Sequence, residues 1–415
     1  ITGGATRSTP ASGINNGGGV YASGGAVVGC DVTGNRCAYR GNGVYSGVTI
    51  RCHFHGNSGA GNYGTYYSDS FNCLFDGGDV SYAHSHRYTH PKDSVYSTHT
   101  MTYDGRIRFA DEKSTIRFGN ADSGANCQVK VDSYITGPGK VQIGNPTSPN
   151  VSGRILLTNP TNVFTGTIAA GLYSYGSLAL ASTNVIPDYA KLSVNGGRVS
   201  LQVPAEDSPW TSNAVTRLAN EATWSGDAIL AFDSAETEGA TNEFSLAGWD
   251  WNEKMTNANV VLGVERGATL IVPGALTHTN RFAVAGGGTV KFAGGGRIDL
   301  GGKMLVSRAL KNGMAGGESR FVFEDATDIH SLTQALTVGS ANVSRMIFKG
   351  SKLVCDEPNS LGVTACYSVV LGNDSGEKGV FEMDADSVVS NRFQVGYASG
   401  SVGAVYQRGG TVLNR

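Results

Sequence analysis

Three short segments near the N-terminus alternate apolar and polar residues around a central cysteine. They read Val28-x-Cys30-x-Val32, Ile50-x-Cys52-x-Phe54 and Phe71-x-Cys73-x-Phe75, and a Gly-Asn or Gly-Gly pair follows each of them. The cysteines are separated by 22 (52 − 30) and 21 (73 − 52) residues. Alternation predicts strands, and a fixed period in the low twenties predicts a solenoid in which one repeat makes one turn. We therefore expect the cysteines and the residues two positions after them to point inward, with the glycines at the corners.

The last part of the chain repeats in the same way, with a slightly longer period. Val370-Leu371-Gly372-Asn373 aligns with Gln394-Val395-Gly396-Tyr397, and the two glycines are separated by 24 (396 − 372) residues. The segments GVFEMDADSVVS (379–390) and GAVYQRGGTVLN (403–414) share a glycine, an alternating apolar stretch, a turn and an apolar pair. A looser copy runs from 338 to 354. Both ends thus favour one all-β architecture, a parallel β-helix whose turns stack about 4.8 Å apart.

Composition fits this architecture and excludes several classes of partner. The 415 residues include 59 glycines, and only 16% of the residues are charged. A solenoid can reach this length as one unit because each turn contacts only its neighbours. The net charge of −2 gives no reason to expect nucleic acid or an anionic membrane as a partner. No apolar run approaches the roughly 18 residues that a membrane span needs.

Both ends of the sequence suggest a mature or excised piece. The first residues, ITGGATRSTP, lack the basic and then apolar layout of a signal peptide, and no initiator Met is present. The last repeat stops at Arg415 without a polar cap. Such an end predicts a cloned fragment, a product of trypsin-like cleavage, or an end that a second copy covers.

The repeats resemble those of known bacterial surface proteins. GGGVYASGGAVVGCDVTGN (17–35) and GNGVYSGVTIRCHFHGN (41–57) are similar to the repeats of polymorphic outer-membrane proteins. Residues 153–201 resemble the autotransporter passenger repeat, with Asn162-x-Phe164-Thr165-Gly166 as its core, and the repeats of the last part resemble those of long autotransporter-like proteins. The resemblance implies a right-handed parallel β-helix that is exported to the surface of a bacterial cell or secreted.

The repeats divide the chain into three regions of one continuous solenoid. Residues 1–105 hold the cysteine repeats, 106–330 hold the passenger-like repeat, and 331–415 hold the longer C-terminal repeats. An irregular insertion near 205–260 interrupts the middle region, and it predicts a short helix or an excursion from the solenoid.

Histidine is concentrated in one part of the sequence. Six of the eight histidines lie between residues 53 and 99: His53, His55, His84, His86, His90 and His99. With Phe54 inward, alternation points His53 and His55 outward on one face, and stacking places Asp76 beside His55. The next similar segment, Met101-x-Tyr103-x-Gly105, is separated from Cys73 by 28 (101 − 73) residues, so the rhythm is broken. We therefore expect 79–99 to leave the solenoid as a His-rich loop.

Three interpretations of this region stay open. The first is a transition-metal site, the one cofactor considered, with ligands from His53, His55, His84, His86 and His90. The second is glycan cleavage, with acid, base and cationic groups from Asp76, Asp79, Asp104, His86 and Arg87. The third is a polar surface without a ligand, because no motif fixes the mutual spacing of these groups.

Tryptophan and the remaining cysteines give two weaker candidates. Trp249 and Trp251 share one face of an extended segment, where they either stack on sugar rings or cover the insertion as core. Cys355 and Cys366 flank a loop and are candidates for a disulfide, and Cys37 lies near enough in sequence to bridge to Cys30.

The sequence favours an adhesive or structural stalk over an enzyme. Its expected partners are a host or neighbouring cell surface, including glycans, and its expected place is extracellular. A β-helical polysaccharide lyase or glycoside hydrolase is the alternative. A weaker alternative is a module that associates with itself through the uncapped end.

Overall fold

The computed structural model is predominantly β, and its strands form parallel sheets. It describes residue 1 and residues 19–22, 24–37, 43–59, 65–76, 79–85, 100–120, 128–143, 154–170, 177–203, 209–226, 228–234, 242–246, 260–265, 267–273, 277–278, 282–284, 288–300, 305–306, 319–331, 336–338, 343–354, 368–372, 375–390, 392–396 and 398–413. These residues form two compact units, which are described separately. Unit 1 comprises 1–201, 205–210 and 221–228, and unit 2 comprises 202–204, 211–220 and 229–415.

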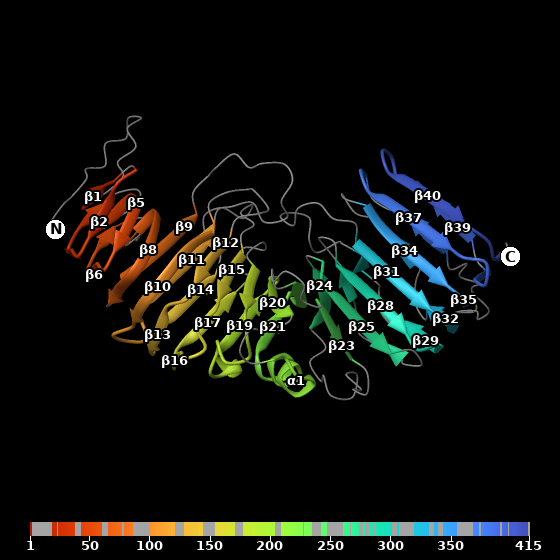
Figure 1. Ribbon diagram of the computed structural model, residues 1–415, viewed down its shortest axis with the longest axis horizontal. Coiled ribbons are helices and arrows are strands. Elements are labelled where there is room, and N and C mark those ends of the chain that lie inside the picture. Colours follow the sequence, from red (N-terminus) through yellow and green to blue (C-terminus); the bar gives the residue numbers. More distant parts are fainter. Residues whose placement is uncertain are drawn as a thin grey trace. The chain divides into compact units, whose positions relative to one another are not determined.

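Unit 1 is built from ladders of parallel strands (Figure 1). The first ladder contains β1 (Val20–Tyr21), β2 (Ala26–Val28), β5 (Val44–Ile50), β8 (Thr65–Asp76), β10 (Thr100–Arg108), β12 (Gln128–Val131), β15 (Arg154–Leu157), β18 (Ser177–Leu180) and β20 (Arg198–Val203). The second runs through β3 (Asp31–Thr33), β6 (His53–His55), the ends of β8 and β10, β13 (Tyr134–Gly137) and β16 (Val163–Phe164). The third contains β9 (Asp79–Ser85), β11 (Thr115–Asn120), β14 (Lys140–Ile143), β17 (Thr167–Ala170), β19 (Leu192–Asn195) and β21 (Thr223–Ser225). A short pair joins β4 (Arg36–Cys37) to β7 (Ser58–Gly59).

Unit 2 repeats the arrangement with its own parallel ladders (Figure 1). One contains β23 (Glu243–Ser245), β25 (Thr269–Pro273), β28 (Thr289–Ala293), β31 (Ser319–Glu324), β34 (Val343–Lys349), β37 (Lys378–Met383) and β40 (Val402–Gln407). Another contains β26 (Thr277–His278), β29 (Gly296–Leu300), β32 (Ala326–Ser331), β35 (Lys352–Val354), β38 (Val388–Ser390) and β41 (Thr411–Leu413). The others are β22 (Ile229–Ser234), β24 (Val261–Glu265), β27 (Phe282–Val284) and β30 (Leu305–Val306), and β33 (Leu336–Val338), β36 (Ser368–Leu371) and β39 (Arg392–Val395).

The strand registers confirm the repeat periods that the sequence predicts. Asp31 pairs with His53 and His53 with Leu74, which reproduces the first two periods of 22 (53 − 31) and 21 (74 − 53) residues. Near the C-terminus, Lys378 pairs with Val402, which reproduces the longer period of the last repeats. All of these pairings are parallel, so the chain must cross over and return in the same direction after each repeat.

The cysteine segments are bent where unbroken strands were expected. A corner immediately precedes each cysteine and is formed by residues with left-handed backbone: Gly29 (φ 63°), Arg51 (φ 52°) and Asn72 (φ 51°). The corner interrupts the alternation, so Val28 and Phe71 lie outside with 54% and 38% exposure. Cys52, Cys73, Val32, Phe54 and Phe75 are buried as predicted, whereas Cys30 is only half-buried.

The fourth repeat aligns differently from the sequence prediction. Gly105, rather than Met101, takes the position of Cys73, and Tyr103 pairs with Ser70. Two residues lie between Ser70 and Cys73, but only one lies between Tyr103 and Gly105, so the register shifts by one residue. The corner residue of the earlier repeats therefore has no counterpart in the fourth repeat. Gly105 has φ 97°, and a Cβ there would collide with the backbone of Cys73, so only glycine fits. Sequence spacing alone could not reveal this deletion.

The structure agrees with the sequence prediction in one of the two irregular regions and differs from it in the other. The expected loop 79–99 begins with strand β9, whose residues pair with β11, and 86–99 lie outside the described residues. The insertion near 205–260 contains the predicted short helix, α1 (Ser212–Glu221), whose Ala214 N–H donates to the Thr211 hydroxyl. A single 3-10 turn, Tyr189–Lys191, precedes β19. Among the described residues no helix is long and apolar enough to cross a membrane.

Aromatic side chains stack through the interior of both units. In unit 2, Phe292, Phe323, Phe348 and Phe381 are fully buried on neighbouring strands. Their ring centroids follow one another at 4.6, 5.2 and 5.0 Å. In unit 1, Phe54, Phe75 and Tyr103 follow one another on β6, β8 and β10, and Tyr103 also contacts Phe118 on β11 of its own repeat. A ring in the middle of such a column, such as Phe323 or Phe348, therefore contacts the turn before it and the turn after it.

The turn after β37 carries a carboxylate that links two repeats. The Asp384 carboxylate accepts hydrogen bonds from the Gly350 N–H at 3.0 Å and from the Ser387 hydroxyl at 2.7 Å. Partial burial raises the pKa of Asp384, but these hydrogen bonds outweigh it and hold the pKa below its ordinary value. The unfolded chain therefore binds this proton at higher pH than the folded chain. The stabilisation is complete above the ordinary carboxyl pKa and is lost as pH falls through the folded pKa.

We expect Asp384→Asn to remove part of the acid sensitivity of unit 2. Asparagine keeps an acceptor oxygen, so the variant loses only the charge, at a cost of about 0.5–1 kcal/mol at pH 7 after solvent screening. The difference from the wild type should shrink as pH is lowered from 5 toward 3. Urea unfolding at several pH values measures it, with Asp386→Asn on the exposed side of the same turn as control. A constant difference across this pH range would contradict the assignment.

Candidate metal-binding site on β3 and β6

The sequence His53-Phe54-His55 forms strand β6 and divides its side chains between two faces. Phe54 is buried against Phe75 of the next strand, with ring centroids 4.9 Å apart. Because side chains alternate along a strand, both histidines point outward, with 37% and 36% of their side chains exposed. The predicted orientation of this pair is confirmed.

Strand β3 supplies two more polar side chains on the same face. Its register pairs Asp31 with His53 and Thr33 with His55, while Val32 pairs with the inward Phe54. The four polar side chains therefore form a square on two neighbouring strands. Asp31 and Thr33 were missed by sequence reasoning, although each lies one repeat period before its partner histidine.

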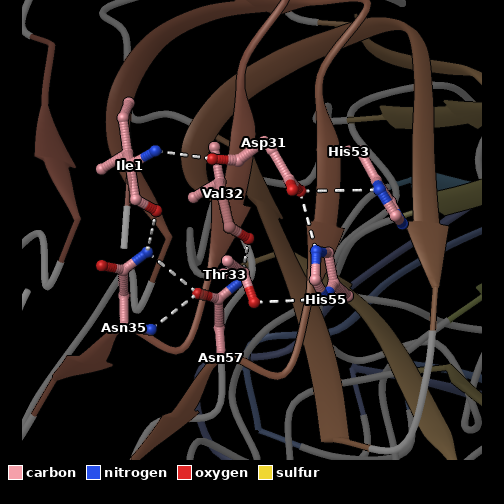
Figure 2. Close-up of polar contacts among 8 residues, drawn as sticks. All are labelled: Ile1, Asp31, Val32, Thr33, Asn35, His53, His55 and Asn57. Atoms are coloured by element: carbon pink, nitrogen blue, oxygen red, sulfur yellow. Dashed lines mark hydrogen bonds and ion pairs between the residues drawn. The ribbon is translucent and has the colours of Figure 1, made fainter. Parts of the chain in front are cut away.

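Both imidazole rings converge on the Asp31 carboxylate (Figure 2). The His55 Nε2 lies 2.8 Å and the His53 Nδ1 3.5 Å from the same oxygen, Oδ1 of Asp31. The other ring nitrogen of His55 lies 3.1 Å from the Thr33 hydroxyl. The two ring centroids are 4.4 Å apart. In the tautomer of His55 whose Nε2 carries the ring proton, Nε2 donates a hydrogen bond to Oδ1 and Nδ1 accepts one from the Thr33 hydroxyl.

A buried asparagine pair fixes the corner that follows the two strands (Figure 2). The Asn57 Oδ1 accepts from the backbone N–H and from the side-chain amide of Asn35, each at 3.1 Å. The Asn57 amide in turn donates to the Val32 carbonyl at 2.8 Å. These bonds tie the end of β3 to the end of β6, so the polar square has a fixed backbone on both strands.

The structure brings together few of the other candidate residues. The register confirms that Asp76 lies beside His55 along β8, and it pairs Asp76 with Arg108 on the other side. The Asp104 carboxylate instead accepts a hydrogen bond from the backbone N–H of Asn72, four residues before Asp76 on β8. Asp79 and His84 belong to β9 in a different sheet. Seven candidate residues from the sequence lie outside the described part of the chain: His86, Arg87, His90, Trp249, Trp251, Cys355 and Cys366.

The cysteine column is a part of the core. Cys30, Cys52 and Cys73 carry free thiols, so the alternative bridge between Cys30 and Cys37 is not formed. The Cys52 N–H donates to the Cys73 sulfur at 3.4 Å, and burial raises the pKa of the Cys73 thiol. Cys52 and Cys73 are therefore small, buried core residues that stack from turn to turn.

Comparison with known protein families, with curated proteins and with solved structures finds no match for this chain. The resemblance to polymorphic outer-membrane proteins and autotransporter passengers therefore stays a prediction from the quoted motifs. Function has to be proposed from the ladders and from the polar square, since function belongs to sites rather than to a fold class.

Proposed function

We propose that this chain is a right-handed parallel β-helix that acts as a structural or adhesive stalk of an exported bacterial surface protein. The observation that supports it best is the stacking of equivalent side chains in register from repeat to repeat. The columns of phenylalanine in unit 2 and of cysteine in unit 1 are examples. Right-handed crossover connections between parallel strands are strongly preferred, which supports the proposed hand.

Charged side chains on the outer face of the strands in unit 2 also form rows of ion pairs that run from repeat to repeat. Glu324 on β31 forms ion pairs with Lys291 on β28 at 2.8 Å and with Lys349 on β34 at 3.0 Å. Glu382 on β37 pairs in the same way with Arg345 and Arg408. Such rows connect successive turns along the surface and suit a shaft, whereas an active site needs groups that converge on one point.

A whole-turn deletion tests the coil. Removing residues 378–401 joins Glu377 to Val402, which pairs with Lys378 and so can take its place. We expect this variant to fold with a cooperative urea transition, because each turn contacts only its neighbours. Removing 378–389 takes out half a turn, and we expect this control to lose the transition. Equal disruption by both deletions would argue against a repeating coil.

An assay on polysaccharides separates the stalk from an enzyme. Purified protein is incubated with a panel of surface and matrix polysaccharides, and both retention and the release of reducing or unsaturated ends are measured. Retention without release supports a stalk that adheres to glycans, and neither retention nor release supports a structural shaft. Release that Asp76→Ala abolishes would overturn the stalk in favour of a β-helical lyase or hydrolase.

A further inference from the structure

We propose that Asp31, His53 and His55 bind one divalent transition-metal ion, of which Zn²⁺ is the representative, on the outer face of unit 1. The site goes beyond the proposed stalk and does not depend on it. Two imidazoles and one carboxylate are a common set of protein ligands for Zn²⁺, and they leave at least one coordination position for water.

The distances among the three groups suit one ion. Their ligand atoms all lie within 4.8 Å of one another. A tetrahedral Zn²⁺ with bonds of about 2.0–2.1 Å holds its ligand atoms roughly 3.3 Å apart. The two measured contacts to Asp31, 2.8 and 3.5 Å, lie on either side of that value. Small side-chain rotations therefore suffice, with no movement of the strands.

The backbone and a neighbouring hydroxyl prepare the site. Buried Phe54 anchors β6 between the two histidines, and the paired register fixes Asp31 opposite His53. The Thr33 hydroxyl lies 3.1 Å from Nδ1 of His55 and so directs Nε2 toward Asp31. A metal-bound histidine usually has such a partner on its second nitrogen, which sets its orientation and tautomer.

The charge balance also favours a cation. Two neutral imidazoles and a carboxylate carry one negative charge, and in the tautomer of His55 that donates from Nε2 a proton lies between Nε2 and Oδ1. A metal ion would take the place of that proton and would bond to both atoms. Since Asp31 belongs to β3 and both histidines to β6, the ion would join two successive repeats of unit 1.

Calorimetric titration of the metal-free chain with Zn²⁺ tests the site. We expect one equivalent to bind, and we expect His53→Ala and His55→Ala each to weaken that binding by at least about 100-fold. Asp31→Asn should weaken it less, and Thr33→Val should weaken it by about tenfold through lost orientation of His55. Co²⁺ in place of Zn²⁺ should give visible absorption that the histidine variants lack.

The control is a triple variant with His84, His86 and His90 all replaced by alanine. It should keep the single equivalent, because the proposed ligands Asp31, His53 and His55 are all unchanged in it. Loss of binding in the triple variant, or full retention in His55→Ala, would overturn the proposal, as would the absence of Zn²⁺ binding by the wild type. If a histidine variant does not fold, chemical modification of the imidazoles in the wild-type chain tests the site instead. Zn²⁺ should protect His53 and His55 from diethyl pyrocarbonate, and equal labelling with and without Zn²⁺ would count against the site.

Discussion

Replacing Phe348 by alanine is expected to lower the free energy of unfolding by about 3–5 kcal/mol. Phe348 on β34 is fully buried, and its ring contacts Phe323 on one side and Phe381 on the other, with centroids 5.2 and 5.0 Å away. The truncation removes the transfer free energy of the ring and leaves a cavity between two neighbouring repeats. Because both neighbours are themselves held in the column, the interior can close this cavity only in part.

Urea unfolding followed by circular dichroism measures this loss. Val405→Ala is the matched control, since Val405 belongs to β40 of the same ladder but is 38% exposed, and it should change stability by less than about 1 kcal/mol. Phe348→Leu should fall between the two, because leucine refills part of the cavity. A loss for Phe348→Ala as small as that of the control would contradict the continuous aromatic column.

The repeated part of the fold could be predicted because its signals are local. Alternation around Phe54 and the recurrence of the cysteine segments were enough to predict the burial of Phe54 and the outward direction of His53 and His55. The corners could not be predicted in the same way. Arg51 and Asn72 adopt the left-handed backbone that Gly29 adopts in the first repeat, so residue type alone does not mark the bend.

Contacts between repeats were harder to predict than the repeats themselves. Strand β9 was expected to be loop because the next similar segment comes later than the repeat period allows, yet pairing with β11 provides its backbone hydrogen bonds. Asp31 was not recognised as a partner of His55, because the two are far apart in sequence and only stacking brings them together. A search for polar residues one period apart would have found Asp31 and Thr33. The same search would not predict which way each ring turns.

The passenger-like motif Asn162-x-Phe164-Thr165-Gly166 has a physical explanation in the structure. Phe164 packs near Phe109 in the interior, with ring centroids 5.7 Å apart. A Cβ at Gly166 would collide with the backbone of Gly139, so this position requires glycine. Asn162 is buried and bonds in two directions, to the repeat before it and to the repeat after it. The residues that carry the resemblance are thus those that a stack of turns needs.

Replacing Asn162 by alanine is accordingly expected to cost about 3 kcal/mol, because it leaves several buried backbone groups without their partner. The side-chain oxygen accepts from the Ile135 N–H at 2.8 Å, and the amide donates to the carbonyls of Asn159 and Val185, each at 3.0 Å. Asn162→Asp should be at least as harmful, since a carboxylate can accept from Ile135 but would face two carbonyl oxygens.

Thermal and urea unfolding of these two variants measure the effect, with Asn184→Ala as the control on an exposed asparagine of the same unit. The control should stay within about 0.5 kcal/mol of the wild type. A further readout is hydrogen exchange, in which the Ile135 amide should lose protection in Asn162→Ala before its neighbours do. If Asn162→Ala matched the control in both measurements, the side-chain hydrogen bonds of Asn162 would not be a source of stability, and the backbone ladders and the apolar interior would have to hold these turns together.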